Sequence, residues 1–172
     1  ILDLFNTAID FLTAHSFLHY EVSNFARIAG PHHDPRTSRH NLKYWTFAPY
    51  IGLGPSAHSF IEPERYWNHR SLATYLRQIE DGKSAMAEKE CLTKTQRTIE
   101  AIYLGLRTTW GINLAEFQAR FGINFANAFR KPIAELENQG MIEINDGHCV
   151  LTRKGLLFID SIASMLICQG LS

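Results

Sequence analysis

Residues 93–172 carry a series of helix-start and turn signals that limits the fold more than any other part of the chain. Thr93 with Gln96 forms a capping box, the pattern that begins an α-helix. Two apolar runs, 141–144 and 149–152, flank Asn145-Asp146-Gly147-His148, and an Asp-Gly pair between such runs predicts a β-hairpin. Helices followed by a hairpin are the parts of a winged helix, so this segment is predicted to be winged-helix-like.

Helical periodicity supports the first two helices of this segment. Asn113 with Glu116 caps the second helix, and Ile112 is placed to meet Phe117 as a hydrophobic staple. The first helix should bury one stripe of apolar residues, spaced three or four apart. These are Ile99, Ile102, Tyr103 and Leu106.

The third helix should begin near Asn124 and end at Gly140, with Pro132 interrupting it. Proline within a helix removes a backbone hydrogen bond and clashes with the preceding turn, so we expect a kink or a break into two short helices. A last helix should begin after Thr152 and run towards Ile167.

Charge argues against nucleic-acid binding by this winged helix. Residues 93–172 hold eight Lys and Arg against seven Asp and Glu, and the third helix sets Arg130 and Lys131 against Glu135 and Glu137. Phosphate neutralisation supplies most non-specific affinity for DNA, and this segment has little to offer. A winged-helix regulator that senses a ligand through the first half of the chain is thus the weakest of three hypotheses, and a docking or lid role is favoured.

The first 92 residues read as an α/β region. Residues 2–15 predict a helix and His19–Phe25 a strand, which together make half of an α/β unit. A second strand is expected at Tyr50–Leu53 and a helix at Ser71–Glu80, while residues 81–92 read as a charged linker. We therefore predict two domains, 1–92 and 93–172. The apolar surface of an incomplete sheet would be covered by self-association.

The segment Ser38–Trp45 concentrates groups suited to a flat apolar ligand. It places the imidazole of His40 near an amide, a phenol and an indole, from Asn41, Tyr44 and Trp45. A neutral imidazole nitrogen binds metals, and aromatic rings cover apolar ligands. The motif is expected to lie in a loop. The alternative is that the two aromatic residues are core anchors of this long loop and that the histidine is an ordinary surface residue.

Three segments in fixed order, Tyr20–Arg27, His40–Trp45 and Tyr50–Ser59, closely resemble the oxygen-independent coproporphyrinogen III oxidase-like family of radical-SAM proteins. The motif His-Asn-x-x-Tyr-Trp is similar to that of the haem-chaperone branch. The resemblance covers nearly the whole chain. It implies the last part of an incomplete parallel (β/α) barrel followed by a winged-helix-like domain, that is, α/β plus α+β.

The resemblance implies a haem site and a cofactor cavity. His40 would be the haem-iron ligand, with Asn41, Tyr44 and Trp45 around the haem and Arg39 or Lys43 pairing with its propionates. In the family, the end of the last barrel strand and the following glycine loop border the cavity for S-adenosyl-L-methionine (SAM) and substrate. The matching residues here are Asn24, Phe25 and Ala26 from the strand, and Ser56, Ala57 and His58 from the loop.

Two further positions leave alternatives open. Glu21 lies among apolar neighbours, where a buried carboxylate would need a partner such as Arg27 or a ligand amine; the alternative is a solvated edge residue. His32 and His33 suggest zinc with His40 or His58, but zinc sites usually include cysteine and none lies nearby.

The cysteines cannot hold the cluster of a radical-SAM enzyme. Cys91, Cys149 and Cys168 are far apart, and no Cys-x-x-x-Cys-x-x-Cys is present. The chain also opens inside a helical pattern without an initiator Met. We expect a C-terminal part of a longer protein, whose missing part would hold the [4Fe–4S] cluster and SAM, and no radical activity in this part alone.

These observations predict the C-terminal portion of a cytoplasmic haem chaperone that binds haem through His40 and passes it to acceptor haemoproteins. Neither a membrane span nor an export signal is expected, and balanced charge argues against nucleic-acid partners. The alternative is coproporphyrinogen III oxidase itself, an enzyme of porphyrin biosynthesis that decarboxylates two propionates by SAM-derived radical chemistry. Whether the protein is an enzyme stays open at this point.

Overall fold

The computed structural model describes residues 2–28 and 36–170. The chain forms two compact units, one made of residues 1–46 with 99–172 and the other of residues 47–98. Each unit is described by itself below. The mixture of α/β and α+β structure predicted from the sequence is confirmed, whereas the predicted domain boundary at residue 92 stays a prediction.

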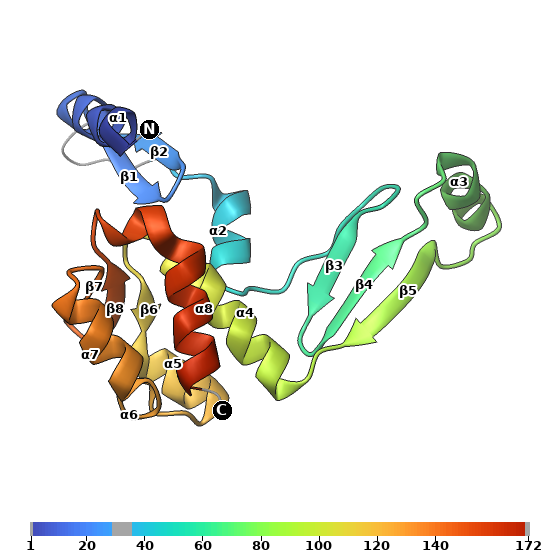
Figure 1. Cartoon of the computed structure of the whole chain (residues 1–172). Helices are drawn as coiled ribbons and strands as arrows, with labels where there is room; N and C mark the ends of the chain where they lie inside the picture. The colour runs from blue at the N-terminus through green and yellow to red at the C-terminus, as the bar shows by residue number, and fades with distance from the viewer. Residues whose placement is uncertain (1, 29–35, 171–172) are drawn as a thin grey trace. The chain divides into compact units, whose positions relative to one another are not determined.

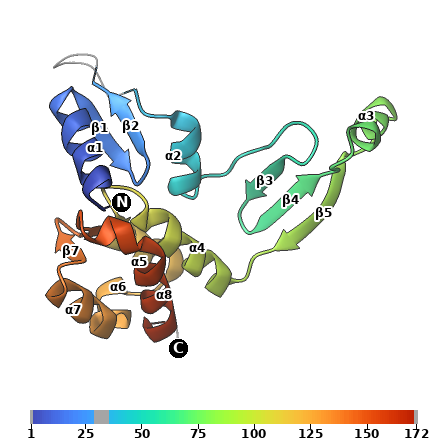
Figure 2. The same ribbon diagram turned by 45° about the horizontal axis from the view of Figure 1, so that its top comes forward.

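The first unit begins with a helix and a hairpin. Helix α1 (Leu2–Ala14) precedes strands β1 (Phe17–Glu21) and β2 (Asn24–Arg27), which pair antiparallel. Figures 1 and 2 both show α1 lying alongside this hairpin. The single strand predicted over His19–Phe25 is wrong, because the chain turns at Val22 and Ser23 and places the segment on two strands.

The winged helix follows in the same unit, and its antiparallel sheet has the strand order β6-β8-β7. The third predicted helix is divided into α6 and α7, and the break falls at Phe129, three residues before Pro132. The elements in chain order are α4 (Lys94–Leu106), β6 (Ile112–Asn113), α5 (Leu114–Phe121), α6 (Phe125–Ala128), α7 (Arg130–Asn138), β7 (Ile142–Asn145), β8 (His148–Leu151), a 3-10 helix (Gly155–Phe158) and α8 (Ile159–Gly170).

The predicted caps and hairpin are confirmed. The Gln96 side chain accepts from the backbone N–H of Thr93 at 2.8 Å, while the Thr93 hydroxyl accepts from the N–H of Gln96 at 3.2 Å. The Asn113 side chain accepts from the N–H of Glu116 at 3.0 Å. Asp146 and Gly147 have φ values of 48° and 75°, the left-handed conformations that a two-residue hairpin turn requires.

A phenylalanine-rich core holds the winged helix together. Phe125 and Phe129 are 1% and 0% exposed, and their ring centroids lie 4.4 Å apart. Ile102 and Leu106 of α4 belong to the same core and are fully buried, which confirms the centre of the predicted stripe. The helix axis of α4 is thus fixed up to its last residue.

The second unit is a three-stranded antiparallel sheet with one helix. Strands β3 (His58–Ile61), β4 (Glu64–Asn68) and β5 (Met86–Cys91) pair in that order, and α3 (Leu72–Glu80) lies between the last two in sequence. The predicted helix at 71–80 is confirmed.

Two predictions for the second unit are wrong. The linker at 81–92 contains β5, whose charged residues suit a half-solvated edge strand. The strand expected at Tyr50–Leu53 is reduced to one isolated bridge between Tyr50 and Phe60, because Gly52, Gly54 and Pro55 favour a loop.

Candidate functional site

The residues predicted to bind haem were expected in a loop, and that expectation is wrong, because they lie on helix α2 (Arg39–Trp45). Ser38 caps it, with its hydroxyl accepting from the N–H of Asn41 at 3.3 Å. The N–H of Ser38 in turn donates to the hydroxyl of Tyr20 at 3.3 Å, and Tyr20 of β1 is 3% exposed. A buried residue of the hairpin therefore fixes where the short helix begins.

His40 and Tyr44 lie together on one face of α2, as a spacing of four residues requires. The Tyr44 hydroxyl lies 3.2 Å from His40 Nε2, and the two rings meet edge to face with centroids 5.0 Å apart. His40 is exposed, and Asn41 and Tyr44 are half-buried. An exposed imidazole beside a phenol can offer a nitrogen to a metal once the hydroxyl moves aside.

Trp45 ends the same helix and packs against a residue far along the chain. The guanidinium of Arg107, just after α4, lies 4.7 Å from the centre of the indole ring. The indole Nε1 is buried and has no hydrogen-bond acceptor among residues 2–28 and 36–170. This packing supports the alternative in which Trp45 is an anchor, and its predicted contact with haem stays a prediction.

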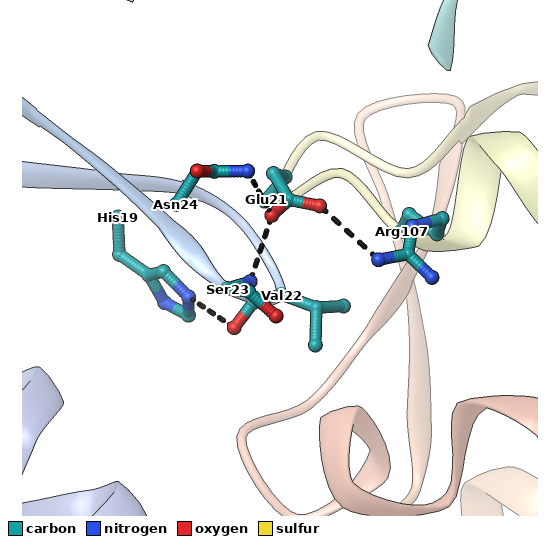
Figure 3. Close-up of polar contacts among 6 residues, drawn as sticks. All are labelled: His19, Glu21, Val22, Ser23, Asn24 and Arg107. Carbon is teal, nitrogen blue, oxygen red and sulfur yellow. Dashed lines mark hydrogen bonds and ion pairs between the residues drawn. The ribbon is translucent and has the colours of Figure 1, made fainter. Parts of the chain in front are cut away.

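Arg107 also reaches a buried carboxylate, that of Glu21 at the end of β1 (Figure 3). The side chain of Glu21 is 1% exposed. Its Oε1 accepts from the N–H of Ser23 at 2.8 Å and from Nδ2 of Asn24 at 2.5 Å, while Oε2 lies 3.5 Å from Arg107 Nη2. The backbone reinforces this contact, since the N–H of Val22 donates to the carbonyl of Arg107 at 3.0 Å.

This arrangement decides between the two interpretations of Glu21. The solvated edge residue is wrong, because Glu21 is buried, and the ion-pair partner is Arg107 in place of Arg27, which is exposed. Sequence reasoning missed Arg107 altogether. Only the burial requirement at Glu21 signalled that a cation had to come from elsewhere.

The three residues of β2 predicted to border the cofactor cavity have structural partners within the first unit. Asn24 donates to Glu21 as described, and the Phe25 ring stacks on His19 at 4.5 Å between centroids. His19 is held in turn by a contact of 3.2 Å between its Nε2 and the carbonyl of Val22 (Figure 3). Ala26 is 2% exposed. Their predicted contact with SAM or substrate stays a prediction.

Ser56, Ala57 and His58 belong to the second unit. The first two lie in the loop before β3, where Ser56 has a φ of 59°, and His58 opens the strand with its ring 5.6 Å from that of Trp67. The glycine loop is closed by Asn68, whose Nδ2 donates to the carbonyl of Gly54 at 3.0 Å. The two predicted walls of the cavity thus lie in separate units, and their joint role stays a prediction.

Neither the cysteines nor other side chains form a metal cluster site in the part of the chain that the structure describes. No group of three His, Cys, Asp or Glu there could hold a metal ion. Burial raises the pKa of the Cys149 thiol to about 12, with the charge of Glu137 adding to the effect, so its thiolate is not available at neutral pH. A [4Fe–4S] cluster therefore does not fit the described residues. His32 and His33, considered for zinc, lie outside the described residues.

Membrane insertion through a helix finds no support in the same residues. Within residues 2–28 and 36–170, none of the helices combines the length and the hydropathy that crossing a bilayer demands.

Comparisons with known proteins agree with the motifs. Residues 92–158 match the family described as the HemN C-terminal domain. The chain is 31% identical over 157 residues to the heme chaperone HemW of Lactococcus lactis, covering 89% of this chain and 38% of that protein. It is 28% identical over 155 residues to heme chaperone HemW of Bacillus subtilis, covering 90% and 39%.

A solved structure shares the fold. Coproporphyrinogen III oxidase (HemN) from Escherichia coli, a radical SAM enzyme, aligns with a TM-score of 0.67 at 20% identity, over 96% of this chain and 40% of that one. The chain thus spans about two fifths of the length of the proteins it matches.

Proposed function

Because the chain belongs to the HemN/HemW family of radical-SAM proteins and corresponds to their C-terminal part, we propose that it is part of a haem chaperone. The chaperone binds haem through His40 and passes it to acceptor haemoproteins. Haem is the cargo in this proposal. The names of the similar bacterial proteins support it, and the experiment below tests it on this chain directly.

One observation carries the proposal, namely the exposed imidazole of His40 on a helix whose two ends are fixed. Ser38 and Tyr20 hold the beginning of α2, and Arg107 holds Trp45 at its end. An axial haem ligand must present one ring nitrogen to the iron while the protein fixes its orientation. The Tyr44 ring lies on the same face and supplies apolar surface beside the iron.

The charged neighbours of His40 suit the propionate groups of haem. Arg39 and Lys43 are exposed on α2, and both are cations at neutral pH. Haem propionates at the edge of the porphyrin pair with such groups, Arg in a bidentate manner. These residues therefore fit haem, in contrast to the cysteines, which do not fit a cluster.

The second part of the proposal concerns the cofactors of the longer relatives. In a full-length protein of this family a [4Fe–4S] cluster and SAM would be held largely by residues outside this sequence. Asn24, Phe25 and Ala26 of this chain would line the SAM and substrate cavity, together with Ser56, Ala57 and His58. We place the protein in the cytoplasm on the same family grounds.

Haem titration of the 172-residue chain tests the proposal. Ferric haem is added to the wild type, to His40→Ala and to His15→Ala, an exposed histidine of the same unit as matched control. The wild type and the control should show a Soret band that shifts and saturates at one equivalent. In His40→Ala the shift should be lost. Equal spectra for all three proteins would refute His40 as the ligand.

Iron-free coproporphyrin III separates the chaperone from the oxidase. A chaperone that holds the iron through His40 should bind the iron-free porphyrin much more weakly than haem. Coproporphyrin binding that exceeds haem binding and does not change in His40→Ala would instead favour the oxidase hypothesis.

A further inference from the structure

Helix α2 cannot hold its own position. It has seven residues, no buried side chain and an exposed histidine, and isolated helices shorter than about 12 residues are marginal in water. Its geometry therefore depends on the groups that attach it to the rest of the unit. At its beginning these groups are Ser38 and Tyr20, which have been described above.

At its end the helix is attached through the contact between Trp45 and Arg107. The planar guanidinium of Arg107 lies over the indole of Trp45, a contact that combines cation–π attraction with apolar packing. Arg107 follows directly on Leu106, which is fully buried in the winged-helix core. The contact therefore connects the end of α2 to the buried core of the winged helix.

Glu21 sets the orientation of that guanidinium. Its carboxylate is buried and uses Oε1 to hold the turn of the hairpin through Ser23 and Asn24, which leaves Oε2 directed at Arg107 Nη2 (Figure 3). A buried carboxylate that binds at two points cannot rotate away without losing its partners. The cation is thus held from one side by Glu21, while its Cζ lies over the Trp45 ring at 4.7 Å from the ring centre.

From this geometry we propose that Arg107 is a positioning residue for His40, and that Glu21 acts through Arg107. The pair aligns α2, so that the imidazole is presented in the geometry that an iron ligand needs. The inference rests on the proposed function for its ligand, but the alignment of α2 is a property of the haem-free protein and is tested separately. It also predicts that Glu21 and Arg107 act in series.

The first test measures amide hydrogen exchange in the haem-free chain. Arg107→Lys retains a charge for Glu21 but loses the planar group over the indole. Amides of residues 42–46 should exchange about 3- to 10-fold faster in this variant. The matched control is Arg120→Lys, since Arg120 also lies over a ring, that of Phe121, on helix α5. Unchanged exchange at residues 42–46 in Arg107→Lys would overturn the inference whatever haem does.

The second test measures haem affinity. Arg107→Lys should weaken haem binding about 3- to 10-fold while the Soret maximum stays that of the wild type, because His40 still ligates the iron. Glu21→Gln, which keeps the shape and removes the charge, should act in the same direction. The double variant should lose no more than Arg107→Lys alone, since the two residues act in series. Fully additive losses would refute that order.

Haem dimethyl ester distinguishes positioning from direct contact with the ligand. Its propionates are esterified and carry no charge, so a salt bridge to Arg107 cannot form. A positioning residue should give the same loss in Arg107→Lys with the ester as with haem. A loss seen only with free propionates would show that Arg107 binds the ligand and would replace the inference.

A failure of the proposed function has a different signature. Equal haem spectra in the wild type and His40→Ala would refute His40 as the iron ligand. Amide exchange at residues 42–46 would then still decide whether Arg107 aligns α2.

Discussion

The winged-helix core and helix α2 belong to one compact unit, yet they are held by opposite kinds of contact. The core consists of side chains such as Phe125 and Phe129 that are removed from water almost completely. Helix α2 has no buried residue and is attached through one hydroxyl, one cap and one cation over a ring. Apolar burial scales with area, whereas each polar contact depends on direction and adds little stability of its own.

The difference indicates how stability and ligand binding are divided. Losing a core side chain affects the whole unit, because its neighbours cannot close the cavity. Losing an attachment of α2 affects the geometry of His40 and leaves the core intact. Variants in the two regions should separate these effects.

The largest expected effect comes from the core. Phe129→Ala removes a fully buried ring and should lower the free energy of unfolding by about 3–5 kcal/mol. Phe158→Ala is the matched control, since that side chain is 48% exposed, and its cost should stay below about 1 kcal/mol. Urea unfolding followed by circular dichroism measures both. Similar losses of unfolding free energy in the two variants would show that the exposure of a side chain does not determine its contribution to stability here.

The second effect tests the sheet of the winged helix at Gly111. This glycine has a φ of 70°, and an added Cβ would overlap the backbone carbonyl of Cys149. Gly111→Ala should cost about 2 kcal/mol or more, from the left-handed conformation together with the overlap. Gly140→Ala is the control, with a φ of 66° and open space around it, and should cost only about 1 kcal/mol. The same urea titrations measure the loss of unfolding free energy in both variants. Equal losses would show that the overlap with Cys149 does not contribute.

The third effect moves to α2 and concerns the ligand. Iron can reach His40 Nε2 only after the Tyr44 hydroxyl has released it, so Tyr44→Phe removes a competitor. A hydrogen bond contributes about 1 kcal/mol net, and the variant should therefore bind haem about 2- to 10-fold more tightly.

Haem titration of Tyr44→Phe beside Tyr66→Phe, a tyrosine of β4, measures this effect. Weaker binding in Tyr44→Phe would show instead that the hydroxyl supports the bound haem. The free energy of unfolding should change by less than about 0.5 kcal/mol in Tyr44→Phe, because the region of α2 adds little to stability.

Sequence predicted best what depends on neighbours along the chain. The capping box of Thr93 and Gln96 and the Asp146-Gly147 turn are decided within four residues, and both are confirmed. The break before Pro132 was predicted in kind, although it falls at Phe129, three residues before the proline.

Contacts between residues far apart along the chain were not predicted from the sequence. The turn between β1 and β2 lies at Val22 and Ser23 and contains neither glycine nor proline. The local sequence therefore did not predict a turn there. The turn is instead stabilised by the buried Glu21 carboxylate, whose ion-pair partner Arg107 lies just after α4, far along the chain. The helical face that His40 and Tyr44 share was not predicted, because the motif was expected in a loop, and the contact of Arg107 with Trp45 was not predicted either.

The smallest effect comes from the indole of Trp45. Its Nε1–H is buried without an acceptor in the described part of the chain, and an unmade hydrogen bond costs about 1–3 kcal/mol. Trp45→Phe removes this donor and keeps a ring under Arg107, so the relief and the lost apolar area should nearly cancel. We expect a change within about 1 kcal/mol in the free energy of unfolding and little change in amide exchange at residues 42–46.

Trp45→Ala is the comparison that gives this small effect its meaning. It removes donor and ring together, so α2 should lose its attachment and residues 42–46 should exchange as fast as in Arg107→Lys or faster. If Trp45→Phe behaved like Trp45→Ala, the indole N–H would have a partner that stabilises the helix. If Trp45→Ala left the exchange unchanged, α2 would be held from its beginning alone, and the contrast between a rigid core and a helix fixed at both ends would fail.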